Sequence, residues 1–208
     1  MVIVALLVIA QLVLPGIAEQ QLRDRLSKSG TVESVQISAF PAIKLLWDDA
    51  DHVAVRMQDY HSDTAHLGSL LGQAGGVGSV DATVGTLTAG LLTVRDAVLH
   101  KRGDQVTASA EVTEADLRAA LPILQSVVPV ASGDGSLTVR GTATVLGVTA
   151  SIDATARAQG GELVVSPDVP FGGLATITVF SDPAVYVQGV SARATADGFR
   201  VSADARIR

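Results

Sequence analysis

Short runs of alternating apolar and polar residues, separated by glycine and aspartate turns, occupy the chain from Val80 onward. An alternation with a period of two is typical of a strand with one buried face. The first runs begin near Val80, Leu92 and Val106, with Asp96 as an in-phase exception and a hairpin turn at 102–104. The later runs are Leu137 to Val145, Val148 to Ala158, Leu163 to Val165, Leu174 to Val179, Val185 to Ala196 and Phe199 to Ile207. This pattern predicts a mostly antiparallel sheet that needs a cover on its apolar face.

Two segments have the pattern of helices. Residues 19–29 are rich in helix formers, and Gly30 is placed to end them. A second helix would begin at Thr113 as N-cap, with Asp116 favourable near the positive end of the helix dipole. Its apolar stripe would be Leu117, Leu121, Leu124 and Val128, ending at Pro129. Pro122 would either kink this helix or divide it into two short ones. This helix is the predicted cover of the sheet, so the expected fold class is α+β.

Residues 40–47 form an apolar wedge between two predicted strands. Pro41 ends the strand before it, because proline has no N–H for a sheet ladder. The apolar members of the wedge are Phe40, Ile43, Leu46 and Trp47, the last three at helical spacings. Acidic residues at 48, 49 and 51 return the chain to the surface before the next strand. The wedge could serve as packing, as a membrane-facing edge or as the rim of an apolar pocket.

The composition limits the classes of protein to consider. The chain has 208 residues, of which 48% are hydrophobic, so it can bury a core. It has no cysteine, which excludes a disulfide framework and thiolate metal sites. Its 15 basic and 21 acidic residues leave a formal charge of −6, without a basic cluster in the sequence. Because nucleic-acid-binding proteins present a basic face, we do not expect nucleic acid as a partner.

The chain begins with an almost uninterrupted apolar run from Val2 to Leu14. The run is shorter than the roughly 20 residues of a membrane span, but it fits the apolar region of a secretory signal. The segment Gly16-Ile17-Ala18 would then offer small residues for cleavage. The basic segment that normally precedes such a region is missing, so either the true start lies upstream or the segment stays as an anchor. A buried strand or helix is a further alternative. We expect a signal peptide or membrane anchor over 1–18, a single domain over 19–208, and export.

The apolar phase of the strands is unusually rich in alanine. Its small residues are Ala108, Ala110, Ala150, Ala154, Ala156, Ala158, Ala192, Ala194, Ala196, Ala203 and Ala205. A face of this kind leaves space either for a closely packed helix or for an acyl chain. From the residues alone, helix packing is the commoner use.

No catalytic pattern is present in the sequence. The nearest approach to a metal site is Asp59, His61, Asp63 and His66, but polar loops collect such residues in any case. There is no Gly-x-Ser-x-Gly elbow, and the glycines at 72–78 are not followed by the Lys-Ser/Thr of a phosphate cradle. We therefore expect neither an enzyme nor a resident metal or cofactor.

Two stretches carry a resemblance to a known family: VESVQISAFPAIKLLW over 32–47, and the strand with a Gly-Phe return over 190–201. Together with the order of the segments, they resemble the actinobacterial LmeA-like envelope phospholipid-binding proteins. The resemblance implies binding of phospholipid, of the phosphatidylinositol type, at the cell envelope or periplasm, and a role in maintaining lipoglycan or other envelope lipids. It also implies a curved sheet wrapped around one or two helices, in a tubular architecture like that of the bactericidal/permeability-increasing proteins. The segment 185–190 departs from the family pattern, because it lacks a second apolar-proline turn.

Two functions of different classes remain. In the first, acyl chains lie between the apolar sheet face and a helix, lined by Phe40, Ile43, Leu46, Trp47, Leu117, Leu121 and Leu124. Lys44 could meet the headgroup, although a solvated lysine is commoner; the partners would be phospholipid and a membrane surface. In the second, the chain is a ligand-free envelope scaffold. If the wedge is a pocket rim, Leu46→Asp should reduce lipid loading more than folding.

Overall fold

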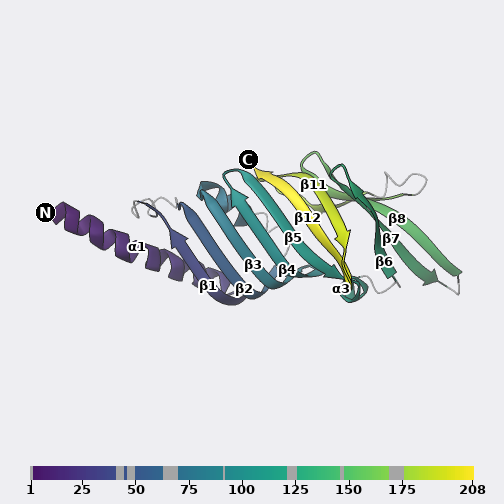
Figure 1. The fold of residues 1–208 in the computed structure, drawn as a ribbon, viewed down its shortest axis with the longest axis horizontal. Coiled ribbons are helices and arrows are strands. Elements are labelled where there is room, and N and C mark those ends of the chain that lie inside the picture. The colour runs from purple at the N-terminus through teal and green to yellow at the C-terminus, as the bar shows by residue number, and fades with distance from the viewer. Residues whose placement is uncertain are drawn as a thin grey trace.

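A computed structural model describes residues 2–40, 45, 50–62, 70–90, 92–120, 126–145, 148–168 and 176–208. The fold is mostly β, and the strands form two sheets (Figure 1). The elements are α1 (Val2–Leu26), β1 (Gly30–Ser38), β2 (His52–Ser62), η2 (Ala74–Gly76), β3 (Ser79–Ala89), β4 (Leu92–Arg102), β5 (Gln105–Thr113), α3 (Glu114–Ala120), β6 (Ser126–Gly133), β7 (Ser136–Val145), β8 (Val148–Gln159), β9 (Glu162–Pro167), β10 (Ile177–Phe180), β11 (Val185–Ala194) and β12 (Gly198–Ile207). The expectation of a β-rich fold with few helices is confirmed, but two sheets replace the single one expected.

The first sheet has seven strands in the order β1-β2-β3-β4-β5-β12-β11, and the second has five in the order β10-β9-β8-β7-β6. Among the described pairings, β2 with β3 is parallel and the others are antiparallel. A parallel pair needs a crossover, and part of this one is a short helical turn that begins at residue 70 and continues into η2. β2 continues to Ser62, so Asp59 and His61, which the sequence analysis assigned to a polar loop, lie on this strand.

Asp96 interrupts the alternation of β4 for a structural reason. It has a positive φ of 47° and lies where the register between β4 and β5 shifts. Such a bulge inserts one residue, so the alternation beyond it changes phase. Val94 therefore packs against the cluster of Val112, and Leu99 packs against the cluster of Val106. Both pairs contribute to one apolar face, which stays continuous across the bulge.

Helix α1 covers the β1 edge of the first sheet (Figure 1). The Glu19 carboxylate accepts a hydrogen bond from the Ile37 N–H at 2.9 Å, and Arg23 donates to the Val32 carbonyl at 3.4 Å. Free backbone groups on an edge strand invite pairing with another chain, and these side chains occupy two of them.

The predicted boundary between a signal peptide or anchor and the domain lies after residue 18. Helix α1 runs through that position without a break. The helix predicted over 19–29 is confirmed as its last part, ending at Leu26. Among the described residues, no helix combines the length and the apolar character that a membrane crossing requires. Cleavage or anchoring at 1–18 stays a prediction.

The opposite edge, β11, is covered by the hairpin turns of the second sheet. The Val187 N–H donates to the Gly161 carbonyl at 2.8 Å, and the Val190 N–H donates to the Gly135 carbonyl at 3.0 Å. Both glycines have positive φ, a conformation that is costly for other residues. The glycine turns therefore also dock the two sheets together.

A core of apolar residues joins the two sheets. Its buried members are Val112, Val190, Ala192 and Phe199 from the first sheet and Val127 and Leu137 from the second. Because all four members from the first sheet lie on one side of it, the second sheet covers that side near β11 and β12.

Helix α3 begins as predicted but ends sooner. The Asp116 N–H donates to the Thr113 hydroxyl at 3.1 Å, which confirms the N-cap. The prediction that Val128 belongs to the apolar stripe of this helix was wrong, because Val128 lies in β6. Pro129 also lies in β6 and therefore does not end the helix. Pro129 lies opposite Val139, and it is tolerated because β6 is an edge strand.

Candidate lipid-binding surface

One row of aliphatic side chains crosses the whole first sheet. Residues that are register partners on neighbouring strands point to the same side of a sheet. The register connects Val35, Val55, Ala82, Leu99, Ala108, Ala203 and Val190, from β1 to β11. We call these residues the seven-strand row and the side that carries them the inner face.

The middle of the seven-strand row is less covered than its ends. Val35 and Val190 are 5% and 4% exposed, whereas the five residues between them are all half-buried. Among the described elements, α1 packs at β1, the second sheet packs at β11 and β12, and α3 reaches β4 and β5. Leu71 and Phe180 pack near Leu99, against the cluster of Val106. At about 4.8 Å between strands, the half-buried part extends roughly 19 Å, compared with about 15 Å for one leaflet of a bilayer's hydrocarbon core.

The neighbouring row on the inner face contains a lysine. Lys101 lies between Val80 and Val106 in register, and it is only 1% exposed. Its ammonium donates a hydrogen bond to the Val77 carbonyl, just after η2. Burial lowers the pKa of Lys101, and nearby Asp104 opposes that shift in part. The segment that contains η2 therefore closes one end of the inner face.

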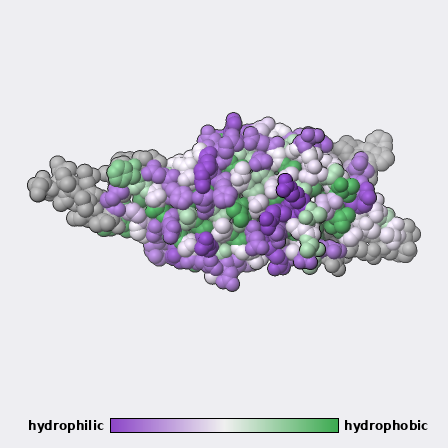
Figure 2. All heavy atoms as spheres, viewed as in Figure 1, coloured by the Kyte–Doolittle hydropathy of each residue, from purple (hydrophilic) through white to green (hydrophobic). Residues whose placement is uncertain are grey.

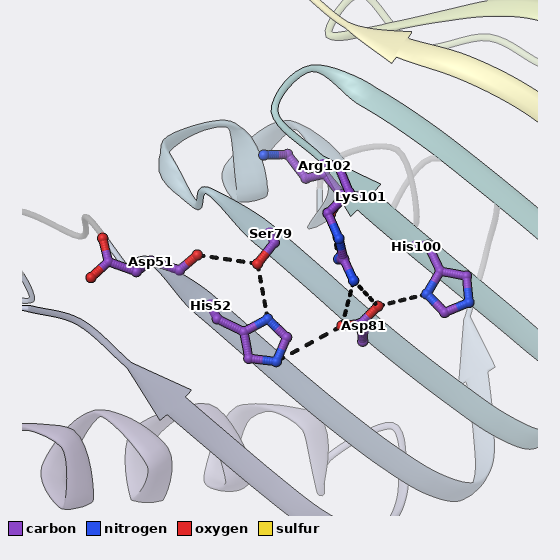
Figure 3. A network of polar contacts seen from close by, with 7 residues as sticks. All are labelled: Asp51, His52, Ser79, Asp81, His100, Lys101 and Arg102. Atoms are coloured by element: carbon purple, nitrogen blue, oxygen red, sulfur yellow. Dashed lines mark hydrogen bonds and ion pairs between the residues drawn. The ribbon is translucent and has the colours of Figure 1, made fainter.

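The other side of the first sheet, the outer face, carries a polar network on β2, β3 and β4 (Figure 3). Asp81 accepts hydrogen bonds from the Arg102 guanidinium at 3.0 Å, and its other carboxylate oxygen lies 2.6 Å from the His100 Nδ1. His52 Nε2 lies 3.8 Å from the same carboxylate. The bonds with His100 and Arg102 lower the pKa of Asp81. The network therefore stabilises an ionised carboxylate at the centre of three strands.

The same network brings Ser79 within 2.9 Å of His52 Nδ1, a contact that sequence spacing did not predict. The Ser79 hydroxyl donates its proton to the Asp51 carbonyl at 3.2 Å (Figure 3). The His52 nitrogen must then donate to the hydroxyl oxygen, so it does not act as a base toward this serine. The arrangement is a surface hydrogen-bond network rather than an activated nucleophile.

Two of the residues that the sequence analysis assigned to a lipid site are described by the structure, and they lie far apart. The other six lie outside the described residues. Phe40 follows β1, is 78% exposed and donates its N–H to the Asp51 carboxylate at 2.6 Å. Leu117 lies on α3 and packs against the core that joins the sheets. The strands β2, β3 and β4 lie between β1 and β5, from which α3 continues, so the two residues are not neighbours. Ile43, Lys44, Leu46, Trp47, Leu121 and Leu124 lie outside the described residues, and the lipid-binding roles of all eight stay predictions.

The loop considered for a metal is also only partly described. His61 Nδ1 lies 4.0 Å from the Asp59 carboxylate, whereas Asp63 and His66 lie outside the described residues. Within the part of the chain that the structure describes, no three histidine or acidic side chains gather as metal ligands would.

A cavity of about 680 Å³ lies where α3, β6 and the β11–β12 turn meet. Its lining is apolar at Val127 and Ala194 and polar at Arg95, Thr113 and Thr195. The Arg95 guanidinium is held by the Asp116 carboxylate at 3.0 and 3.1 Å, so it is already neutralised. The cavity adjoins the apolar core and offers a mixed wall at the strand ends.

The seven-strand row was only partly visible in the sequence. The alternation and the alanine-rich phase identified its members on β5 and β12 as apolar. Nothing local indicated that Ala108 lies beside Ala203, because pairing between distant strands leaves no periodic signal.

Comparison with known proteins identifies the family. The family model for LmeA-like phospholipid-binding proteins matches residues 5–195, which include nearly all of the described strands. No curated protein and no solved structure matches the chain. The match covers most of the 208 residues and includes every member of the seven-strand row except Ala203. The chain therefore belongs to the LmeA-like phospholipid-binding family.

Proposed function

We propose that the protein binds phospholipid by holding an acyl chain along the half-buried middle of the seven-strand row. The row is continuous, aliphatic and about as long as the acyl part of one leaflet. Burying its exposed apolar area against a chain would be favourable, at roughly 25 cal/mol per Å². The main support for this proposal is the alignment of five residues that are only half-buried: Val55, Ala82, Leu99, Ala108 and Ala203.

The small side chains support a ligand more than dry packing at this position. Ala108 and Ala203 are register neighbours and leave a shallow strip between the larger Leu99 and Val190. Helix α3 adjoins β4 and β5 near Arg95 and Thr113, whereas Leu71 and Phe180 pack against the Val106 cluster together with Leu99. The cavity next to α3, where apolar lining gives way to polar lining, would accommodate the headgroup end of the lipid.

A pair of matched substitutions tests the proposal. Ala82→Asn would place an unpaired amide against the acyl chain, which should reduce lipid loading about tenfold, since such burial costs about 1–3 kcal/mol. Ala54→Asn is the control, because Ala54 is the register partner of Asp81 on the outer face. Native mass spectrometry after incubation with phospholipid vesicles measures the loaded fraction. Equal loading of the two variants would contradict binding at this row.

The alternative is a ligand-free envelope scaffold. Hydrogen exchange separates the two functions, because a bound chain should slow exchange in β3 and β4 when lipid is added. Absence of lipid from the purified protein, together with unchanged exchange in the presence of vesicles, would favour the scaffold.

We also propose that the protein is exported, acts at the cell envelope and supports the maintenance of envelope lipids or lipoglycan. Support comes from the apolar start of the chain and from the phospholipid-binding family. Phosphatidylinositol-type lipid is the first ligand to test, and transfer between donor and acceptor vesicles would distinguish transport from static binding. The tubular arrangement, with a sheet curved around the lipid, belongs to the same proposal. The mass of the protein recovered from cells would report whether residues 1–18 are removed.

A further inference from the structure

Two arginines face each other across the last hairpin of the first sheet. Arg193 on β11 and Arg200 on β12 are direct register partners. Ser191 and Ser202 form another register pair two residues along, and therefore on the same side. Ala192, which lies between Ser191 and Arg193, is buried in the core on the inner face. The two arginines and the two serines therefore share the outer face.

The four side chains surround a small cavity. Its volume is about 310 Å³, and its lining consists of Ser191, Ala192, Arg193, Arg200 and Ser202. Figure 2 shows strongly hydrophilic residues gathered over the region of β11 and β12. The cavity offers the Arg193 guanidinium, the Arg200 N–H groups that do not bond Glu111, and two hydroxyl groups as hydrogen-bond donors.

The charges around this cavity are not balanced. Arg200 forms an ion pair with Glu111 on β5, with which it is in register. Within the described part of the chain, no carboxylate forms an ion pair with Arg193, and the Arg193 side chain is exposed. Like charges directly opposite each other on a sheet are destabilising. The chain as a whole has a formal charge of −6, but positive charge is in local excess here. A bound anion would reduce the repulsion between the two arginines.

We propose that Arg193 and Arg200, with the hydroxyls of Ser191 and Ser202, bind a phosphate group. The planar fork of arginine matches two phosphate oxygens, and charge-assisted hydrogen bonds of this kind are stronger than neutral ones. Serine hydroxyls add donors from the neighbouring pair. The site lies on the opposite side of the sheet from the seven-strand row, so its ligand is separate from a lipid chain held there. The phosphate could belong to the headgroup of a membrane lipid or to a soluble compound.

Arg193→Gln is the test variant, because this arginine has no ion pair to lose among the described residues. Arg157→Gln is the matched control, since Arg157 is an exposed arginine on β8 in the second sheet. Titration calorimetry with inorganic phosphate tests soluble phosphate. Co-sedimentation with phosphatidylcholine vesicles, with and without phosphatidylinositol, tests the headgroup. Unchanged thermal unfolding would show that both variants are folded.

We expect Arg193→Gln to weaken binding about tenfold, since the variant loses a charge-assisted hydrogen bond to the phosphate. Arg157→Gln should leave binding unchanged, and Arg193→Lys should give an intermediate affinity because it keeps the charge but loses the fork. Weakened phosphate binding assigns the site to soluble phosphate, and an effect confined to phosphatidylinositol vesicles assigns it to the headgroup. Failure of both probes to bind the unaltered protein, or equal weakening by the two glutamine variants, overturns the proposal. Acyl loading, measured by native mass spectrometry on the same Arg193→Gln protein, should not change, so the two proposals fail independently.

Discussion

The ammonium of Lys101 donates a hydrogen bond to the carbonyl oxygen of Val77, and this contact ties the crossover after β2 to the inner face of the first sheet. Lys101 is the charged member of a row that otherwise contains aliphatic residues such as Val80 and Val106. Burial of an ammonium group is unfavourable unless its charge is compensated. The position of Lys101 therefore makes the stability of this part of the fold sensitive to its protonation.

Replacement of Lys101 by Met should change how stability depends on pH. Burial lowers the Lys101 pKa below its ordinary value of 10.5, so between the two pKa values the unfolded chain binds more protons. The unaltered protein should therefore gain stability relative to Lys101→Met as the pH rises toward 10.5. Urea unfolding at a series of alkaline pH values measures the difference, and parallel pH curves would argue against a perturbed Lys101.

Asp81→Asn should remove a stabilisation of the folded state that is present at neutral pH and lost in acid. The bonds with His100 and Arg102 lower the pKa of Asp81 from its ordinary 3.8, so the ionised form is favoured in the folded state. This contribution is complete above the ordinary pKa and is lost as the pH falls through the lowered one. The stability gap between the unaltered protein and Asp81→Asn should therefore narrow in acid. Asp204→Asn removes an exposed carboxylate on β12 and is the control for the loss of one surface charge.

Loss of the α3 cap should destabilise the protein by about 1 kcal/mol in Thr113→Ala. The Thr113 hydroxyl accepts from the Asp116 N–H at 3.1 Å and donates to the Asp116 carboxylate at 2.6 Å. Thr113→Ser keeps both bonds and should retain most of the stability. Chemical unfolding of the two variants is the measurement. A serine variant as unstable as the alanine variant would point to the lost methyl group instead of the cap.

Alanine substitutions at two adjacent glycines should distinguish the cost of backbone strain from the cost of a steric clash. Both Gly160 and Gly161 have positive φ, of 63° and 93°. A Cβ at Gly160 would meet open space, whereas one at Gly161 would lie 2.5 Å from the Tyr186 ring. Gly160→Ala should cost roughly 1–2 kcal/mol from strain alone, and Gly161→Ala should cost about 1–3 kcal/mol more. Equal unfolding free energies would indicate that Tyr186 moves aside without cost.

Local chemistry was enough to predict several elements of this fold. The turn at 103–104 requires positive φ at Gly103, and the Thr113 cap needs only a hydroxyl three residues before an N–H, so both follow from neighbours in the chain. The alternating strands from Ser136 to Gln159 are likewise found close to where their period places them. The β6 region was misassigned because a few apolar residues near a proline fit a helix end as well as an edge strand.

Contacts between distant residues decided the rest. No local pattern could indicate that β2 and β3 pair in parallel, or that the glycine turns of the second sheet would cover β11, because pairing depends on which edges meet in space. The same reason kept Arg193 and Arg200 from being recognised as a pair, and Ala108 and Ala203 as neighbours. The alternation of apolar and polar residues determined strands with one apolar face. The pairing register between strands that are distant in sequence aligned those faces into one row that a lipid chain could follow.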